Sequence, residues 1–467
     1  MRISELRLKQ KVAILGFGKE GKSTLNFLLK LGLSIHQITI IDQNIITDGN
    51  IKIKNIHGKK YLDSLQEFDI IIKSPGISPY HKKILPVRDK ITSQTEIFFN
   101  NYSGKIIGIT ATKGKSTTAS LLYETLKEVE YNVKLVGNIG TPVLDQIDIL
   151  SDDLYEFIIY ELSSYMLETC VPECDIAVLG NIYTCHLDWH DNKFSVYEQA
   201  KLNILKKSDN KIISEDFAKY VTDNENTYLY GIHSEYGYSD THFLQGEKEL
   251  FSLENVLLLG EHNKKNISCV VVILSVITQK YKNNSPWIFS KLTNALQDIL
   301  TSFSGLPHRM EKIGTYNYIT FIDDGISTTP ESTIEALKTF GNKINTLFLG
   351  GGDYGFTQES YTLLKEYIIQ YKVENIVLFP DTGLDIFNIK RDSLDNDSIF
   401  THIYNNFSIN ILYTNNMEHA VQFAYKYSGK ENICIMSCAA PSYSLWSGYE
   451  EKGKLFKEYI ELYKKLD

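Results

Sequence analysis

The residues with the clearest chemical potential form one stretch, Gly108-Ile-Thr-Ala-Thr-Lys-Gly-Lys-Ser-Thr-Thr118. An apolar, β-prone run from Lys105 to Ile109 leads into it, and a helical pattern from Ala119 to Val129 follows. A strand, a turn of small residues and a helix that begins with Gly-Lys-Ser bind phosphate groups. The helix N-terminus presents backbone N–H groups, the lysine neutralises charge and the hydroxyl ligates Mg²⁺. The stretch therefore predicts an ATP site, although its spacing is shorter than the general pattern.

A rival stretch lies upstream, where residues 11–42 predict a strand, a Gly-rich turn, a helix and a second strand that ends in Asp42. The turn Gly16-Phe-Gly-Lys-Glu-Gly21 has the G-x-G-x-x-G spacing of dinucleotide-binding folds, in which a downstream acid contacts a ribose hydroxyl. The same turn, continued by Lys22 and Ser23, also satisfies the phosphate pattern G-x₄-G-K-S. Asp42 favours the Rossmann-like interpretation, and a tight turn without a ligand stays open.

Other polar residues also follow apolar runs. The buried strand predicted from Phe157 to Glu161 ends in a carboxylate, which beside a phosphate loop is a usual arrangement for Mg²⁺. Taken alone, Glu161 is as often a surface or capping acid. Lys201, in a helix predicted from Ser195 to Lys206, is by itself an ordinary solvated helix residue.

A chain of 467 residues is too long for one hydrophobic core. Alternating strands and helices predict an α/β protein of three domains. These are a Rossmann-like N-terminal domain over 1–104, a central P-loop ATPase-type domain with a mixed sheet over 105–305, and a C-terminal Rossmann-like domain over 306–467. In the third domain, polar or Gly-rich turns that follow Ile322, Leu349 and Met436 should meet at one sheet edge.

Composition narrows the class of function. The formal net charge of −9 argues against nucleic acid or an anionic membrane as the main partner. A hydrophobic content of 43% and a charged content of 22% are typical of a soluble globular protein. No apolar run of about 18 residues is present, so we expect a cytoplasmic protein, and we expect a monomer. Its six cysteines are expected to be free thiols.

Taken together, ten ordered motifs resemble the Mur ligase family along essentially the whole chain. They are I-T-x-T-x-G-K-S-T, G-N-I-G, E-L-S-S, H-L-D-x-H, Y-x-x-A-K-L, G-x-H-N-x-x-N, P-H-R-M-E, D-x-x-x-T-x-P-E, L-G-G and Y-E-E-K-G-x-L-F. The resemblance implies an ATP-dependent amide ligase of peptidoglycan precursor synthesis. The implied reaction joins D-glutamate to UDP-N-acetylmuramoyl-L-alanine through an acyl phosphate, so the partners are small-molecule substrates.

The resemblance also assigns residues. It implies that the G-x₄-G-K-S match at Gly16 is not the ATP site. The implied ATP-binding residues are Gly114, Lys115, Ser116, Thr117, Asn263, Asn266, Arg309 and Asp324. The UDP-substrate residues are Gly16, Phe17, Gly18, Asp42, Gly76 and Asn138, and the glutamate residues are Thr328, Ser442 and Tyr449. The Mg²⁺ ligands are Ser116, Glu161, His186 and Lys201, with Lys201 in carbamylated form. Lys115, His186 and Lys201 are the implied catalytic residues.

The departures from the family pattern cluster at the amino-acid pocket. Ile326 stands where well-known members have a lysine, and Asp353-Tyr-Gly-Phe356 lacks a second family lysine. Arg or Lys from elsewhere, or backbone N–H groups, must then pair with the two carboxylates of glutamate. An L-glutamate-adding variant, a related amide ligase such as a folylpolyglutamate synthase, and a non-catalytic nucleotide-binding homologue remain the alternatives.

Overall fold

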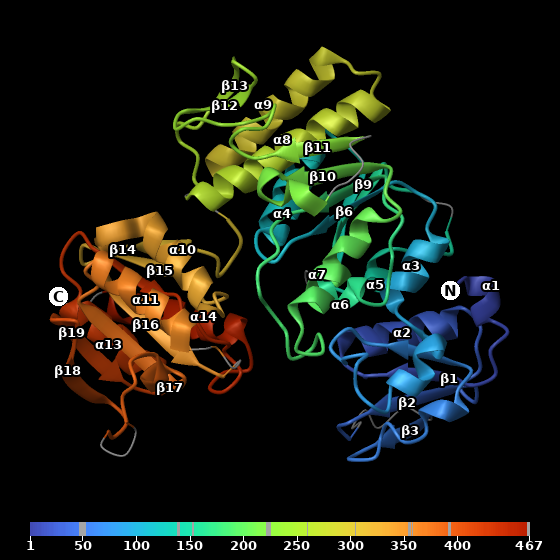
Figure 1. The fold of residues 1–467 in the computed structure, drawn as a ribbon, viewed down its shortest axis with the longest axis horizontal. Coiled ribbons are helices and arrows are strands. Elements are labelled where there is room, and N and C mark those ends of the chain that lie inside the picture. The colour runs from blue at the N-terminus through green and yellow to red at the C-terminus, as the bar shows by residue number, and fades with distance from the viewer. Residues whose placement is uncertain are drawn as a thin grey trace. The chain divides into compact units, whose positions relative to one another are not determined.

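The computed structural model describes residues 1–45, 53–137, 141–151, 154–220, 226–258, 260–303, 305–353, 356, 358–390 and 394–464. Within these ranges the chain forms two compact units. The first comprises Met1–Asn255 and His262–Leu300, and the second comprises Val256–Glu261 and Thr301–Asp467. The first unit contains two of the principal sheets and the second unit contains one (Figure 1).

The N-terminal part of the first unit is a parallel sheet with the order β3-β2-β1-β4-β5. Every residue of β1 is buried, as expected for a short apolar run in a parallel sheet covered on both faces. The carboxyl ends of its strands lie at one edge, where a glycine-rich turn connects β1 to α2. The elements are α1 (Ile3–Leu6), β1 (Val12–Leu15), α2 (Lys19–Lys30), β2 (Ile38–Asp42), β3 (Lys54–His57), β4 (Ile70–Lys73), β5 (Ile91–Thr92) and α3 (Gln94–Asn101).

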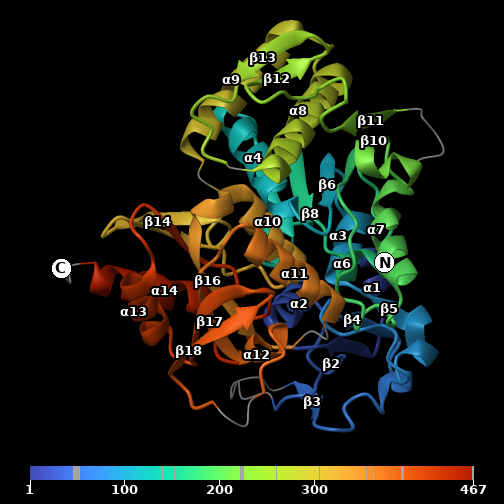
Figure 2. The same ribbon diagram turned by 60° about the vertical axis from the view of Figure 1, so that its left-hand side comes forward.

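The central part of the first unit is built on a sheet with the order β11-β10-β9-β6-β8-β7. Helix α8 runs beside α4 in both views (Figures 1 and 2). The elements are β6 (Ile106–Thr110), α4 (Lys115–Glu128), β7 (Val133–Gly137), α5 (Val143–Gln146), β8 (Phe157–Glu161), α6 (Ser164–Leu167), β9 (Ile176–Leu179), α7 (Phe194–Leu202), β10 (Asn210–Ser214), β11 (Thr227–Tyr230), β12 (His242–Gln245), β13 (Lys248–Ser252), α8 (Glu261–Tyr281) and α9 (Pro286–Ser302).

The second unit is a mixed sheet with the order β14-β15-β20-β16-β17-β19-β18, in which the two outermost pairs are antiparallel. Pro330 at the start of α10 and the side chain of Thr329, which accepts a hydrogen bond from Ser332 N, fix where that helix begins. The elements are β14 (Glu311–Tyr316), β15 (Ile319–Asp323), α10 (Pro330–Phe340), β16 (Ile344–Gly351), α11 (Gln358–Gln370), β17 (Asn375–Asp381), α12 (Gly383–Ile386), β18 (Ser398–Tyr404), β19 (Phe407–Tyr413), α13 (Met417–Tyr427), β20 (Ile433–Met436) and α14 (Tyr449–Tyr463).

The expected α/β class with its three sheets in sequence order is confirmed. One detail differs, because every described pair of the central sheet is parallel and not mixed. In the described residues of this region, antiparallel pairing occurs in the separate hairpin β12–β13 and in the isolated bridge between Tyr238 and Phe243. The domain limits 1–104, 105–305 and 306–467 remain our proposal, and each range holds one principal sheet.

The N-terminal and central parts of the first unit contact one another through aromatic and polar side chains. Phe98 and Phe99 of α3 pack against Tyr160 of β8, with ring centroids 5.3 Å apart in each pair. Ser78 Oγ donates to Trp189 O at 2.7 Å. These contacts make the two sheets one packed unit.

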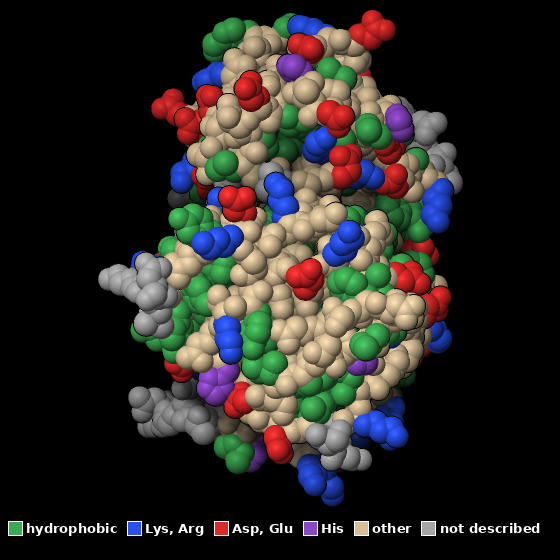
Figure 3. All heavy atoms as spheres, turned by 90° about the vertical axis from the view of Figure 1, so that its left-hand side faces the viewer, with side chains coloured by type: hydrophobic (Ala, Val, Ile, Leu, Met, Phe, Trp, Pro, Cys, Tyr) green, Lys and Arg blue, Asp and Glu red, His purple; other side chains and the backbone are tan. Residues whose placement is uncertain are grey.

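The surface carries charges of both signs. On the face shown in Figure 3, basic and acidic side chains are interspersed, and neither forms a continuous patch. Among the helices of the described ranges, none combines the length and the hydrophobicity that a bilayer crossing requires.

Candidate active site

The phosphate loop connects β6 to α4 and turns sharply at Gly114. Gly114 has a φ of +87°, and a Cβ atom there would lie 2.3 Å from Asn266 Oδ1, so both backbone and space require glycine. Helix α4 begins at Lys115, and its first intrahelical bond runs from Thr118 N to Gly114 O. Lys115, Ser116 and Thr117 therefore form the first turn, where N–H groups and the helix dipole attract anions.

The loop is held from its outer side by residues that follow β9. Thr112 N donates to Asn181 O at 2.7 Å, and Lys113 N donates to Asn181 Oδ1 at 2.8 Å. Thr112 Oγ1 lies 2.7 Å from the hydroxyl of Tyr197. Because β6 and β9 are neighbours in the sheet, Asn181 reaches the loop from the adjacent strand end. The loop is thus rigidly positioned by its own domain.

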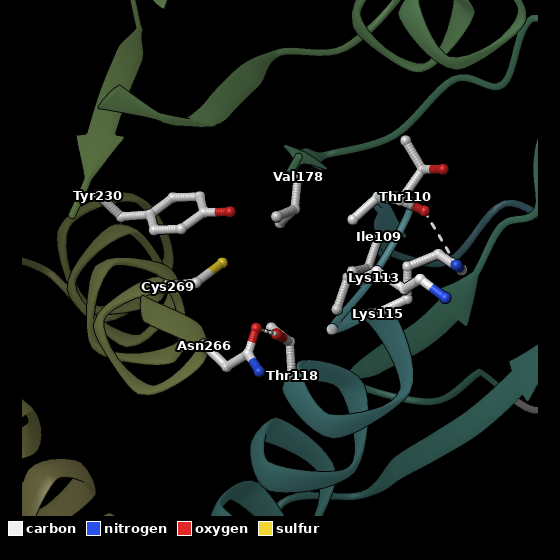
Figure 4. A pocket seen from close by; sticks show the side chains of 12 residues that line it. Ile109, Thr110, Lys113, Lys115, Thr118, Val178, Tyr230, Asn266 and Cys269 are labelled. Atoms are coloured by element: carbon white, nitrogen blue, oxygen red, sulfur yellow. Dashed lines mark hydrogen bonds between the residues drawn. The ribbon is translucent and has the colours of Figure 1, made fainter. Parts of the chain in front are cut away.

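The side chain of Lys115 lies along the loop, with Nζ donating to Ala111 O at 2.9 Å and to Thr112 O at 3.3 Å. Figure 4 shows the pocket beside it, between the end of β6 and helix α8. Asn266 enters this pocket from α8, 3.5 Å from Thr118 Oγ1, and Asn263 Oδ1 accepts from Asn266 Nδ2 at 3.1 Å. Both asparagines that the sequence assigned to ATP therefore belong to the phosphate-loop region.

A second cluster lies behind the loop and contains the predicted metal ligands. Glu161, at the end of β8, is buried, and Lys201 of α7 is 2% exposed. Lys201 Nζ donates to Ala111 O at 2.7 Å and to Thr110 Oγ1 at 3.3 Å. Burial, and after it the neighbouring charge of Lys115, hold the pKa of Lys201 well below its ordinary value.

His186 belongs to the same electrostatic cluster. Burial lowers the pKa of His186 to about 4, and the charges of Lys113, Lys115 and Lys201 lower it in the same direction. At neutral pH the imidazole is therefore uncharged, which is the form that ligates metals. A carboxylate, a hydroxyl and an uncharged imidazole are donor types that suit a divalent cation with oxygen and nitrogen ligands.

The N-terminal turn has a different geometry. Gly16 has a φ of +92°, and a Cβ atom on Gly21 would lie 2.1 Å from Gly16 O. Asp42 accepts from Phe17 N at 2.7 Å and from Asn44 N at 2.8 Å, so its carboxylate orders the turn. Gly18 caps α2, and Gly76 has open space around it. The last predicted UDP contact, Asn138, lies outside the described residues.

The remaining predicted residues belong to the second unit. Asp324 is buried and accepts from Ser327 Oγ and Ser437 Oγ at 2.6 Å each, and burial raises its pKa to about 6. The charge of Arg309 acts on Tyr449, whose ring lies 5.6 Å from that of His308. Thr328 is half-buried and Ser442 is 3% exposed. The residues predicted to bind glutamate, and two of those predicted to bind ATP, thus lie in or beside the loops that precede β14 and follow β15 and β20.

Comparisons with known proteins match the N-terminal and central parts of the first unit to two parts of one family. The model for the "Mur ligase MurD-like, N-terminal domain" matches residues 10–94, and the model for the "Mur ligase middle domain" matches residues 109–274. A UDP-N-acetylmuramoylalanine–D-glutamate ligase of Buchnera aphidicola subsp. Schizaphis graminum is 31% identical over 482 residues, 98% of each chain. The chain belongs to the Mur ligase family. Mur ligases are ATP-binding, Mg²⁺-using ligases of peptidoglycan precursor synthesis.

Two further proteins are similar to this Mur ligase, one in sequence and one in fold. A ligase with the same name from Clostridium kluyveri is 29% identical, and the match covers 97% of this chain and 96% of that ligase. The crystal structure of MurF ligase from Thermotoga maritima in complex with ADP aligns with a TM-score of 0.57 at 18% identity, over 98% of this chain and 96% of that chain. The second likeness concerns the fold alone.

Sequence reasoning missed the residues that hold the phosphate loop in place. Asn181 and Tyr197 contact the loop, but no role was predicted for either. For Asn181 a signal existed, because it follows a strand that neighbours β6 and so had to end at the same sheet edge. Tyr197 offered none, since a tyrosine in a helix is ordinarily a packing residue.

Proposed function

We propose that this Mur ligase joins D-glutamate to UDP-N-acetylmuramoyl-L-alanine, converting ATP to ADP and phosphate. The observation that carries the proposal is the full-length match to ligases named for this reaction, 27–31% identical across 97–98% of the chain. The N-terminal match to a MurD-like domain supports the same substrate choice. The intact phosphate loop argues against a non-catalytic homologue.

In the proposed reaction, a carboxylate oxygen of the alanyl group attacks the γ-phosphorus of ATP, and the bond to the bridging oxygen of ADP breaks. The amine of glutamate then attacks the acyl carbon, loses a proton, and phosphate leaves from the tetrahedral intermediate. Both reactants of the first step are anions, so catalysis depends on positioning and on charge.

The phosphate loop supplies both the positioning and the positive charge. In this proposal the first turn of α4, from Lys115 to Thr117, and Gly114 bind the ATP phosphates, and Asn263 and Asn266 bind the nucleotide from α8. Arg309 and Asp324 complete the ATP set. The loop geometry supports this role, because Asn181 and Tyr197 fix the loop before any ligand arrives.

Ser116, Glu161, His186 and Lys201 are the proposed Mg²⁺ ligands, and the metal would offset the negative charge of the phosphates. The suppressed pKa of Lys201 supports a carbamate there, because an uncharged amine adds to carbon dioxide and releases one proton. The resulting anion would be attracted to the neighbouring ammonium group of Lys115. This chemistry requires the buried and uncharged amine that the local contacts favour.

The turn at Gly16, Phe17 and Gly18, with Asp42 and Gly76, is the proposed site for the UDP part of the substrate, together with Asn138. Thr328, Ser442 and Tyr449 are proposed to hold the glutamate. Ile326 and the absence of lysine between Asp353 and Phe356 favour testing L-glutamate as the second candidate acceptor.

The test is phosphate release from ATP with UDP-N-acetylmuramoyl-L-alanine, measured with D-glutamate and with L-glutamate in parallel. We expect release that depends on both substrates and is faster with D-glutamate. Faster release with L-glutamate would assign the variant specificity. Release with neither amino acid would refute the proposed function.

A further inference from the structure

Lys452 is a fully buried lysine for which the reaction described above has no use. It is the fourth residue of α14 and is 0% exposed. Among the described residues, no oxygen or nitrogen atom accepts a hydrogen bond from its Nζ, which interacts with the thiol of Cys438. Burying an ammonium group without a partner costs several kcal/mol, so such a group is retained where an anion compensates it.

The surroundings of Lys452 are the loops that follow β15 and β20. Its Cε atom lies 3.5 Å from the position of a Cβ atom on Gly325, and its Nζ lies 5.8 Å from the ring centroid of Trp446. The thiol of Cys438 is a further neighbour, since Lys452 lowers the pKa of that thiol against the effect of burial. A thiol is a weak acceptor and an indole ring carries no net charge, so neither compensates the ammonium.

The two carboxylates closest in sequence to Gly325 are engaged by other groups. Asp323 accepts from Gly325 N at 2.9 Å and lies 2.7 Å from His308 Nδ1. Asp324 accepts from two hydroxyl groups and from Met310 N. Both acids therefore accept hydrogen bonds from other groups, and among the described residues neither accepts one from Lys452 Nζ.

Ser442 is a second buried donor in the same region. It is 3% exposed, and among the described residues its Oγ has no hydrogen-bond partner. Trp446 N donates to Ser442 O at 3.0 Å, so Ser442 and the ring beside Lys452 belong to one turn. A cation and a hydroxyl without partners, buried at one edge of a sheet, suit a carboxylate, which accepts from both.

We infer that Lys452, together with Ser442, binds a carboxylate of the incoming amino acid. The inference rests on the proposed function and deepens it, because it names the cation that replaces the missing lysines of this pocket. Ile326 follows Gly325 directly, so the ammonium of Lys452 reaches the same loop from α14. Lys452 is thus a specificity-determining residue for an acidic acceptor.

The test compares three lysine variants in the phosphate-release assay. Lys452→Met keeps the length of the side chain and removes its charge, and Lys452→Arg restores a cation. Lys457→Met is the matched control, because Lys457 lies on the same helix and pairs with Glu311 at 2.7 Å. We expect Lys452→Met to raise the KM for glutamate by about 10- to 100-fold. The KM values for ATP and for the UDP substrate should stay unchanged.

Lys452→Arg should recover most of the loss, and Lys457→Met should change the KM for glutamate by less than about twofold. An unchanged KM for glutamate in Lys452→Met, with a lower melting temperature, would overturn the inference and make Lys452 a structural counter-ion. An inactive wild-type enzyme would instead refute the proposed function, so the two failures are distinguishable.

A measurement on the wild type covers the case in which Lys452→Met does not fold. With ATP analogue and UDP substrate present, added glutamate should slow hydrogen exchange in the peptide 448–458. Exchange in this peptide that is unaffected by saturating glutamate would overturn the inference.

Discussion

Two turns of this chain carry Gly-Lys-Ser, and they differ in where the helix begins. At the central turn, α4 begins at Lys115, so the lysine and the serine are its first two residues. At the N-terminal turn, α2 begins at Lys19, and Lys22 N already donates to Gly18 O at 3.0 Å. The same three letters therefore lie at the anion-binding end of one helix and at the third to fifth residues of the other.

The comparison teaches that a phosphate pattern has meaning only in register with its helix. In α2 the glycine of the triplet serves packing, since Gly21 lets the helix approach the carbonyl of Gly16. In α4 the glycine serves the turn itself through its positive φ. The N-terminal turn is thus a Rossmann-like connection, and the central turn is the phosphate loop.

The largest effect that tests this comparison is expected for Lys115→Met. Loss of the cation in the first turn of α4 should lower kcat for phosphate release on the order of 10²–10³-fold. The folded state should be little affected, because the hydrogen bonds from Lys115 Nζ to Ala111 O and Thr112 O stay within its own loop. Steady-state kinetics and circular dichroism together check both parts. Activity close to that of the wild type would remove the loop from the catalytic site.

A smaller effect is expected for Lys201→Ala, which removes the proposed carbamate. Activity should fall by at least about 10- to 100-fold, as when groups around a bound metal are lost. Added short-chain carboxylic acid should restore part of it, because a free carboxylate can occupy the space. Lys201→Arg keeps the charge but cannot form the carbamate, and it should not respond to the acid. Equal responses of the two variants would contradict the carbamate.

The buried strands of the fold were largely predictable, whereas the outer strands of its sheets and the ends of its helices were not. Short apolar runs such as Val12–Leu15 and Phe157–Glu161 predict buried strands because parallel sheets bury both faces. Strand β18 alternates between exposed and half-buried residues at an outer position of its sheet, so its sequence lacks that signal. Helix α4 begins four residues before the helical pattern that starts at Ala119, because the polar run Lys-Ser-Thr-Thr shows no hydrophobic periodicity.

The residues of the candidate site were likewise predictable only in part. Residues whose role depends on local chemistry, such as Lys115 and Glu161, could be predicted from their positions after strands. Lys452 could not, because a lysine in the run Glu-Glu-Lys-Gly-Lys has the pattern of a solvated helix. Its burial arises in part from the packing of α14 against the loop that follows β15, where Gly325 lies more than a hundred residues earlier in the chain.

An effect on stability is expected at the N-terminal turn, where Gly21→Ala and Gly18→Ala form a matched pair. A Cβ atom on Gly21 would collide with Gly16 O, whereas one on Gly18 would meet open space. Gly21→Ala should lower the free energy of unfolding by about 1–3 kcal/mol. Gly18→Ala should cost less than about 1 kcal/mol, the cost of a poorer N-cap. Urea denaturation measures both, and equal losses would refute the packing role of Gly21.

The smallest effect is expected for Lys22→Met, the counterpart of Lys115→Met in the rival turn. Lys22 is exposed and lies beyond the first turn of α2. The kcat for phosphate release should therefore change by less than about twofold, as for other exposed charges. A loss comparable with that of Lys115→Met would show that the rival turn also binds the triphosphate.

The most direct test of the division between the two turns is calorimetric titration of each ligand against one variant of each turn. Lys115→Met should weaken binding of a non-hydrolysable ATP analogue at least about tenfold, the value of one charge-assisted hydrogen bond, and leave the UDP substrate unaffected. Asp42→Asn should weaken the UDP substrate and leave the ATP analogue unaffected. If both variants lost the same ligand, or if the two effects were exchanged, the assignment of the two turns would be wrong.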